Sequence, residues 1–370
     1  MASSHAHIVA DGPWTSATAE TPDALRVEQV DAATWDAALE AFDDVNYEQT
    51  AAYAERRWGS EHVICLLVRE RGALVGAACH GLIRVPLLGK IGFCKYGPVW
   101  RVKGGSADPH QYRRIVQTLL DHAGDTGLAL TIVPRAHPVY TELEAAELAA
   151  LGLRARPCLN GDHYIVDATL SAEEQMASFT APCRANMRKA LGTGVTVTEL
   201  DDFTIFDRLD AEMKGRKGIV IFRPQDVLPA LTQALPVPLR PYGLVAWHEG
   251  KPVAAHIYGI LGDTAYYLYG ATSRDALPVR AGYRLHWETL ERIRGRARWY
   301  DLGISSENPG MQRVKEGLIG KRGKLVIVPH EFDYAPDAHA RAVLAAVHAL
   351  RSLRRSSIAL AGTLKAKSSP

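Results

Sequence analysis

Short apolar runs and longer amphipathic stretches alternate along the chain from about residue 60 onward. Residues 62–68 and 74–84 are largely apolar runs on either side of the charged turn 69–72, which is typical of a β-hairpin. Residues 91–100 predict a further extended stretch, and the apolar run 128–133 predicts another strand.

A helix is predicted between these last two stretches. Asp108 followed by Pro109 is the pattern of an N-cap and a first helical residue. The apolar positions that follow have helical spacing and mark one buried face: Tyr112, Ile115, Val116, Leu119 and Leu120. Strands and helices that alternate in this way predict an α/β fold with mixed sheets.

The hairpin pattern recurs 178 residues further along the chain. Residues 66–83 read LLVRERGALVGAACHGLI, and residues 244–261 read LVAWHEGKPVAAHIYGIL. Five positions are identical at this offset: Leu66, Gly72, Val75, Ala77 and Gly81 recur as Leu244, Gly250, Val253, Ala255 and Gly259. Each hairpin is followed by a strand, a helix (108–123; 281–293) and a strand (128–133; 299–303). The sequence therefore predicts an internal repeat with the same order of elements in both halves.

The remaining segments complete a division into four parts. Helices are expected at 171–179, 182–191, 202–214 and 223–235, with Gly192 closing the second, and a strand is expected at 195–200. We expect a flexible leader at 1–22, a first domain at 23–170, a second domain at 171–335, and a C-terminal helix with a basic tail at 336–370. The tail's apolar positions should pack on the first domain.

Composition narrows the class of protein. The chain has 370 residues, of which 47% are hydrophobic, enough for two cores. No apolar run is long enough for a membrane-spanning helix, and the leader lacks the apolar core of a signal peptide, so we expect a cytoplasmic protein. The five cysteines are an odd number without a CxxC pair, which predicts reduced packing residues.

Charge is unevenly distributed although the net charge is only +2. Acidic residues dominate the stretch 11–48, whereas basic residues gather at 184–189, 214–217, 292–298 and 313–324. For any one basic cluster a solvated helix face is the favoured interpretation. Several clusters converging on one groove would instead indicate an anionic substrate.

The order hairpin, strand, helix, strand resembles the core of the Gcn5-related N-acetyltransferase (GNAT) fold. Two such cores in tandem resemble the Fem family of peptidoglycan-bridge aminoacyltransferases. Four segments carry the resemblance: a basic helix before a Gly-Val strand (185–195), a tyrosine-rich strand (265–271), a Tyr-Asp-Leu-Gly strand end (300–303) and a Lys-x-Gly segment (312–320). The resemblance implies two tandem GNAT-like domains and transfer of an aminoacyl or acyl group to an amine.

Acyl transfer of this kind needs an activated carbonyl held near a neutral amine, with charge stabilisation where the oxyanion develops. It needs no nucleophilic side chain. The sequence has no G-x-S-x-G elbow, no HExxH helix and no P-loop motif, and its histidines lack metal-ligand spacing. We therefore expect no metal and no tightly bound cofactor.

Two residues are candidates for catalysis. Lys315 lies in the Lys-x-Gly segment and could stabilise an oxyanion or bind a phosphate of the carrier; a solvated helix lysine is the alternative. Asp301, at a predicted strand end, could orient the amine or accept its proton, as could His256 or His286. For a lone histidine, a buried structural role is the commoner case.

Five further residues are candidates for substrate binding. Arg184 and Arg188 lie four residues apart on one helix face, which suits a phosphate clamp or a salt-bridged surface. Strand alternation places Tyr267 and Tyr269 on one side and Tyr266 on the other, forming a hydroxyl-bearing wall or a packed core face. Tyr96, beside a Gly-Pro-Val segment that resembles the Fem family's, is a possible acceptor-site residue.

Three functions remain open on the sequence. The favoured one is an aminoacyltransferase that uses aminoacyl-tRNA as co-substrate and forms a peptide bond with an amine of a cell-wall precursor or natural product. The second is an N-acyltransferase that uses acyl-CoA. The third is a non-catalytic protein of an envelope or exopolysaccharide pathway. The expected partners are an amine acceptor and tRNA, with no DNA and no integral membrane segment.

Overall fold

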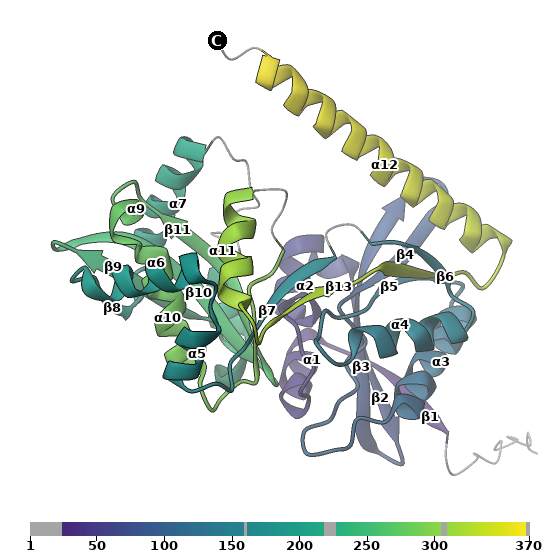
Figure 1. The fold of residues 1–370 in the computed structure, drawn as a ribbon. Coiled ribbons are helices and arrows are strands. Elements are labelled where there is room, and N and C mark those ends of the chain that lie inside the picture. The colour runs from purple at the N-terminus through teal and green to yellow at the C-terminus, as the bar shows by residue number, and fades with distance from the viewer. Residues whose placement is uncertain (1–23, 159–160, 218–226, 305–308, 368–370) are drawn as a thin grey trace, which may run out of the picture.

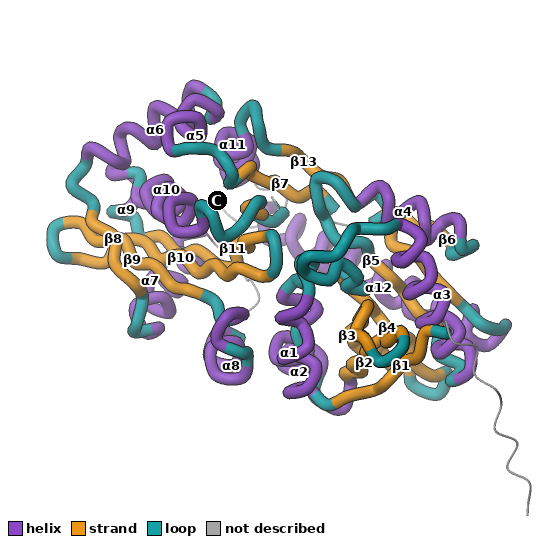
Figure 2. Tube along the Cα trace, turned by 90° about the horizontal axis from the view of Figure 1, so that it is seen from below, coloured by secondary structure: helices purple, strands orange, loops and turns teal. Residues whose placement is uncertain are grey.

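The computed structural model describes residues 24–158, 161–217, 227–304 and 309–367, with backbone alone at 230 and 354–367. The expected leader at 1–22, and residues 223–226 of the expected helix 223–235, lie outside these ranges. The described chain forms two lobes, each built on a seven-stranded sheet (Figures 1 and 2). The predicted α/β fold class is confirmed. No helix in the described ranges is both long and apolar enough to cross a membrane.

The first lobe holds a sheet with the order β1-β2-β3-β4-β5-β14-β6. Its strands are β1 (Leu25–Val30), β2 (Val63–Glu70), β3 (Ala73–Val85), β4 (Gly89–Lys95), β5 (Ala129–Val133), β14 (His330–Tyr334) and β6 (Arg154–Pro157). Helices α1 (Ala32–Ala38), α2 (Ala51–Trp58) and α12 (Ala338–Lys367) cover one face, and α3 (Pro109–Asp125) and α4 (Thr141–Ala150) cover the other.

The second lobe holds a sheet with the order β13-β7-β12-β11-β10-β9-β8. Its strands are β13 (Lys324–Ile327), β7 (Asp162–Asp167), β12 (Trp299–Asp301), β11 (Thr264–Thr272), β10 (Lys251–Leu261), β9 (Tyr242–His248) and β8 (Thr196–Glu199). One face carries α5 (Ala172–Ser178), α6 (Ala181–Gly192), α9 (Ala276–Val279), α10 (Ala281–Ile293) and α11 (Pro309–Ile319). The other carries α7 (Phe203–Lys217), and α8 (Leu228–Ala234) packs against α2 of the first lobe.

The repeated hairpins occupy corresponding positions in the two sheets. Each has a two-residue turn in which both residues adopt positive φ: 50° and 85° at Arg71 and Gly72, and 51° and 75° at Glu249 and Gly250. This is the turn whose twist matches that of the flanking strands, and glycine adopts its second position without strain. The equal turns explain why the recurring sequence pattern is readable at a constant offset.

The two halves exchange their last strands. Strands β1–β7 and β8–β14 follow the same order, but β7 lies in the second sheet between β12 and β13, and β14 lies in the first sheet between β5 and β6. The domain limits expected at 170 and 335 do not follow this exchange. They assign β7 to the first domain and β14 to the second, whereas β7 lies in the second sheet and β14 in the first. Burial patterns indicate a strand but not the sheet it joins, so the sequence does not show the exchange.

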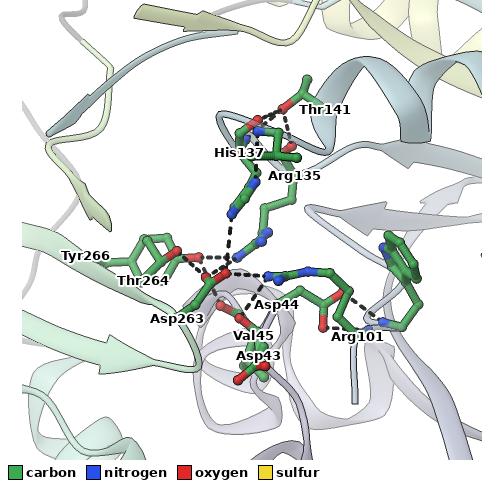
Figure 3. Close-up of polar contacts among 12 residues, drawn as sticks. Asp43, Asp44, Val45, Arg101, Arg135, His137, Thr141, Asp263, Thr264 and Tyr266 are labelled. Carbon is green, nitrogen blue, oxygen red and sulfur yellow. Dashed lines mark hydrogen bonds and ion pairs between the residues drawn. The ribbon is translucent and has the colours of Figure 1, made fainter. Parts of the chain in front are cut away.

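A buried polar network joins the lobes around Asp263, at the turn between β10 and β11 (Figure 3). From the first lobe, Arg101 Nη2 donates to Asp263 Oδ2 at 2.8 Å, and Arg135 Nη1 lies 3.7 Å from Asp263 Oδ1. His137 Nε2 lies 3.3 Å from Asp263 Oδ2. The backbone N–H of Val139 donates to His137 Nδ1, so Nε2 carries the ring proton and donates to the carboxylate.

Electrostatics explain why this carboxylate stays charged although it is mostly buried. Burial alone would raise the pKa of Asp263, but the His137 hydrogen bond and the guanidinium groups of Arg135 and Arg101 lower the pKa below its ordinary value. Tyr266 Oη adds a further link, because it donates to the Val45 carbonyl at 3.0 Å and accepts from Arg135. The network fixes the second sheet against the first.

Replacing this carboxylate by an amide tests the network. We expect Asp263→Asn to lower the free energy of unfolding by about 3–5 kcal/mol, because two buried guanidinium groups lose the charged carboxylate that they contact. Urea unfolding followed by circular dichroism measures the change, with Asp201→Asn, at an exposed position, as the matched control. Equal stability of the two variants would show that the network contributes nothing to lobe docking.

Candidate active site

Strands β11 and β12 separate from each other after a short stretch of parallel pairing. They pair only from Thr264 opposite Trp299 to Tyr266 opposite Asp301, while β11 continues to Thr272. In the first sheet, by contrast, β4 and β5 stay paired up to the last residue of β4. The second sheet therefore opens at Asp301, and the chemistry-bearing side chains lie around this opening.

A chain of three hydrogen-bonded side chains begins at Asp301. His163 Nδ1 lies 2.9 Å from Asp301 Oδ2, and Tyr96 Oη lies 3.0 Å from His163 Nε2. The Gly303 N–H donates to Asp301 Oδ1 at 2.7 Å and fixes the carboxylate. Because a carboxylate accepts, we assign the ring proton to Nδ1, which leaves Nε2 to accept from the phenol. The three groups form a continuous path for a proton.

The three members come from different parts of the chain. Asp301 ends β12, His163 lies on the exchanged strand β7, and Tyr96 follows β4 of the first lobe. Asp301 and His163 are buried, whereas Tyr96 is half-buried, so Tyr96 is the most exposed of the three residues. The path therefore exists only where the lobes meet.

Tyr96 adopts a conformation that is rare for a residue with a side chain. Its φ is 57°, in the left-handed region, so the extended stretch predicted at 91–100 ends as a strand at Lys95. Such strain persists where surrounding contacts hold it and is concentrated at functional sites. Burial, with a smaller effect of Glu48 and Asp301, raises the pKa of Tyr96 well above its ordinary value, which keeps the phenol protonated.

Lys315 points into the same region from α11. It is only 5% exposed, and its Nζ donates to the carbonyl of Ile304. Burial lowers the pKa of Lys315 to about 8, while the carboxylates of Asp301 and Asp162 oppose this shift. At neutral pH the side chain is therefore a cation close to its transition range.

The glycines of the Lys-x-Gly segment hold α11 against the rest of the lobe. A Cβ on Gly317 would lie 2.8 Å from Cys183 Cβ on α6, and one on Gly320 would lie 2.2 Å from the Ser178 carbonyl oxygen. Gly320 also has a positive φ of 55°. These close approaches explain why the segment needs glycine at both positions, and they fix the helix that carries Lys315.

The predicted tyrosine wall is wrong. Tyr258 of β10 pairs with Tyr267 and the preceding Ile257 pairs with Tyr269, so Leu268 is an extra residue in β11. This β-bulge shifts the alternation by one position. Tyr267 faces the core below α10, whereas Tyr269 packs on the opposite face with α7.

The histidines considered for amine binding belong to the core next to Tyr267. The His256 and Tyr267 ring centroids are 4.3 Å apart, and His286 Nδ1 lies 3.1 Å from Tyr300 Oη. Burial, and then the Lys315 ammonium, lower the pKa of His286 to about 3, so the ring is neutral. Burial also lowers the pKa of His256. Both rings therefore act as packed neutral groups.

The basic helix stands apart from these residues. Arg184 Nη1 donates to the carbonyls of Ala177 and Phe179 and so caps the end of α5, while Arg188 is exposed. A phosphate clamp by this pair stays a prediction. Among the described residues, no group of three or more His, Cys, Asp or Glu side chains could hold a metal ion.

Of the predicted site residues, the structure brings Tyr96, Asp301 and Lys315 together. Sequence reasoning missed His163, which joins two of them. No motif marks it: it lies in an ordinary strand pattern, Asp162 to Asp167, and its partners are 67 and 138 residues away. Its polar ring at a buried position of a strand was the one available signal.

Comparison with known proteins identifies the fold. Residues 177–309 match the family model described as an acetyltransferase (GNAT) domain. These residues of the second lobe therefore resemble a GNAT domain. The mixed α/β structure with two seven-stranded sheets is consistent with tandem GNAT domains. The comparison with curated proteins found no match.

Several solved structures share the fold of this chain at low sequence identity. A crystal structure of FemX is 16% identical with a TM-score of 0.69, covering 84% of this chain and 97% of FemX. A protein of unknown function from Bacteroides thetaiotaomicron is 12% identical with a TM-score of 0.55, covering 84% and 98%. The C-terminal domain of a putative lysylphosphatidylglycerol synthetase from Agrobacterium fabrum is 16% identical with a TM-score of 0.50, covering 85% and 96%.

The pH dependence of the free energy of unfolding tests whether the Lys315 ammonium is buried. Below pH 8 folding buries an ammonium that the unfolded chain keeps in water, and this cost disappears as the pH rises from 8 to 10.5. We expect wild type to gain about 3 kcal/mol relative to Lys315→Met between pH 7 and 10.5. Urea unfolding at several pH values measures the difference. The exposed Lys321→Met serves as control, and a difference that does not change with pH would contradict the burial of the charge.

Proposed function

We propose that this protein transfers an aminoacyl or acyl group from an activated carrier to an amine, by direct attack of the amine on the carbonyl. The proposal rests on the path Asp301–His163–Tyr96, with Lys315 beside it at the opening of a GNAT sheet. These groups supply the two requirements of the reaction, which are a proton acceptor and a cation for the oxyanion. A covalent enzyme intermediate is not needed.

In the first step the neutral amine attacks the carbonyl carbon and a C–N bond forms. The ammonium of Lys315 stabilises the negative charge that develops on the carbonyl oxygen. The amine proton passes to Tyr96 Oη while Tyr96 passes its own proton to His163 Nε2. Asp301 stabilises the resulting imidazolium through Nδ1.

In the second step the tetrahedral intermediate collapses and the C–O or C–S bond to the carrier breaks. The proton returns from His163 through Tyr96 to the departing oxygen or sulfur. Because the pKa of Tyr96 is raised, its phenol relays a proton in both directions and does not persist as a phenolate. Protons and electron pairs balance over the two steps.

For the donor we favour aminoacyl-tRNA, with a small cell-wall precursor or natural-product amine as acceptor. The similarity in fold to FemX over most of both chains supports this choice. Acyl-CoA is the second candidate, because the family model that matches residues 177–309 is named for acetyltransferases. Thermal unfolding in the presence of charged tRNA or of acyl-CoA species separates the two, since a ligand that binds the folded state raises its stability.

The proton path predicts a linked set of kinetic effects. We expect Tyr96→Phe and His163→Gln each to lower kcat by roughly 10²–10⁴-fold, with little further loss in the double variant, because the two groups act as one unit. Transfer from charged tRNAs or acyl-CoA to a panel of amines provides the measurement, and the exposed His330→Gln is the control. Single variants with full activity, or losses that multiply in the double variant, would exclude the relay.

A further inference from the structure

The C-terminal helix α12 differs in charge from the rest of the chain. From residue 338 to the C-terminus there are six basic residues and no acidic one: Arg341, Arg351, Arg354, Arg355, Lys365 and Lys367. The whole chain has a net charge of +2, so the remaining residues are net negative. A helix of 30 residues is about 45 Å long, which exceeds the width of the sheet face on which α12 begins.

The first half of α12 is firmly anchored on the first lobe. Val343, Leu344 and Val347 are buried against Ile91 and neighbouring residues of the sheet. Two carboxylates of β14 then hold the next turn. His348 Nε2 lies 2.9 Å from Asp333 Oδ2, and Arg351 Nη1 and Nη2 donate to both oxygens of Glu331 at 3.0 and 3.1 Å. These contacts fix the direction in which the helix continues.

The second half extends beyond the first sheet, as the yellow helix in Figure 1 shows. Where it leaves the lobe, Leu350 is 53% exposed and Leu353 is 68% exposed. The sequence continues this spacing with Leu360 and Leu364, which marks one helix face. That face is rotated by about a third of a turn from the face that packs on the sheet.

Three kinds of partner could cover such a helix: a second copy of the chain, RNA or an anionic lipid surface. They differ in which of its side chains they would contact favourably. A second copy of the chain would cover the leucines but would bring a second helix of the same positive charge alongside. RNA would neutralise the arginines and lysines but would leave Leu350 and Leu353 in water. An anionic lipid surface would accommodate the leucines as well as the basic residues, because leucines insert among the acyl chains and basic side chains bind the lipid phosphates.

We propose that the distal half of α12 binds the surface of an anionic lipid bilayer and lies in its plane. The helix then acts as a fixed arm that holds the first lobe at the membrane. This inference does not depend on the proposed transferase activity, because it rests on the helix alone.

Co-sedimentation of the full chain with vesicles tests the proposal. We expect binding to phosphatidylcholine vesicles that contain phosphatidylglycerol, weaker binding as salt is added, and little binding to pure phosphatidylcholine. Arg354→Glu with Arg355→Glu should weaken binding by more than tenfold, because each basic residue near an anionic surface contributes about 1 kcal/mol. Leu350→Ser with Leu353→Ser should weaken it by about tenfold or more.

The matched control carries the same charge change elsewhere. Lys103→Glu with Lys251→Glu alters two exposed lysines on the lobes and should leave vesicle binding unchanged. All variants should keep the thermal unfolding midpoint of wild type, since the anchored half of α12 is intact.

Three results would overturn the proposal. The first is equal binding of wild type and both helix variants to the anionic vesicles. The second is no vesicle binding together with tRNA binding that only the arginine variant loses, which would assign the helix to RNA. The third is a lipid-independent dimer that the leucine variant dissociates, which would assign it to a second copy.

Discussion

The pairing of β7 with β12 is the contact on which the candidate site depends. Through it a strand from the first half of the chain completes the second sheet, and the register that places Ile165 opposite Asp301 also places His163 within hydrogen-bonding distance of that carboxylate. A slip of one residue would turn the histidine to the other face of the sheet, because side chains alternate along a strand. Both faces of the sheet are covered by helices, so burial fixes the register.

Charged side chains as well as apolar ones lie between the two lobes. The negative and positive groups among them compensate one another, and this stabilises the contact between the lobes. Asp263 is held by guanidinium groups and a neutral imidazole, and its carboxylate remains ionised although it is mostly buried. Beside it, Tyr266 links this network to the strand that pairs with Asp301. The groups that fix the lobes and the groups that could carry chemistry are therefore neighbours. A change that loosens the first set should also disturb the second.

Local patterns in the sequence were sufficient for many of the elements after residue 60 and, with the family resemblance, for the fold class, but they did not predict β1, α1, α2, α4, β6 or β7. Asp108 and Pro109 begin α3, and the recurring turn glycines Gly72 and Gly250 mark equivalent hairpins. What the sequence could not show was long-range: the exchange of β7 and β14, and the contact of His163 with Tyr96 and Asp301. The extra residue at Leu268 was also invisible, because a bulge depends on the partner strand and not on local alternation. Lys315 and Asp301 lie in segments that carry the resemblance, and the geometry added His163, which links Asp301 to Tyr96.

The exchanged strands also limit how the molecule can move. Only four residues separate β6 in one sheet from β7 in the other, and only two separate β13 from β14. At about 3.5 Å per residue, links this short cannot stretch across a widening gap. The two links therefore keep the connected strand ends of the two sheets close together, and any rotation of one lobe against the other would have to turn about these two points. Donor and acceptor would then meet at a centre whose two halves are tethered to each other at two places.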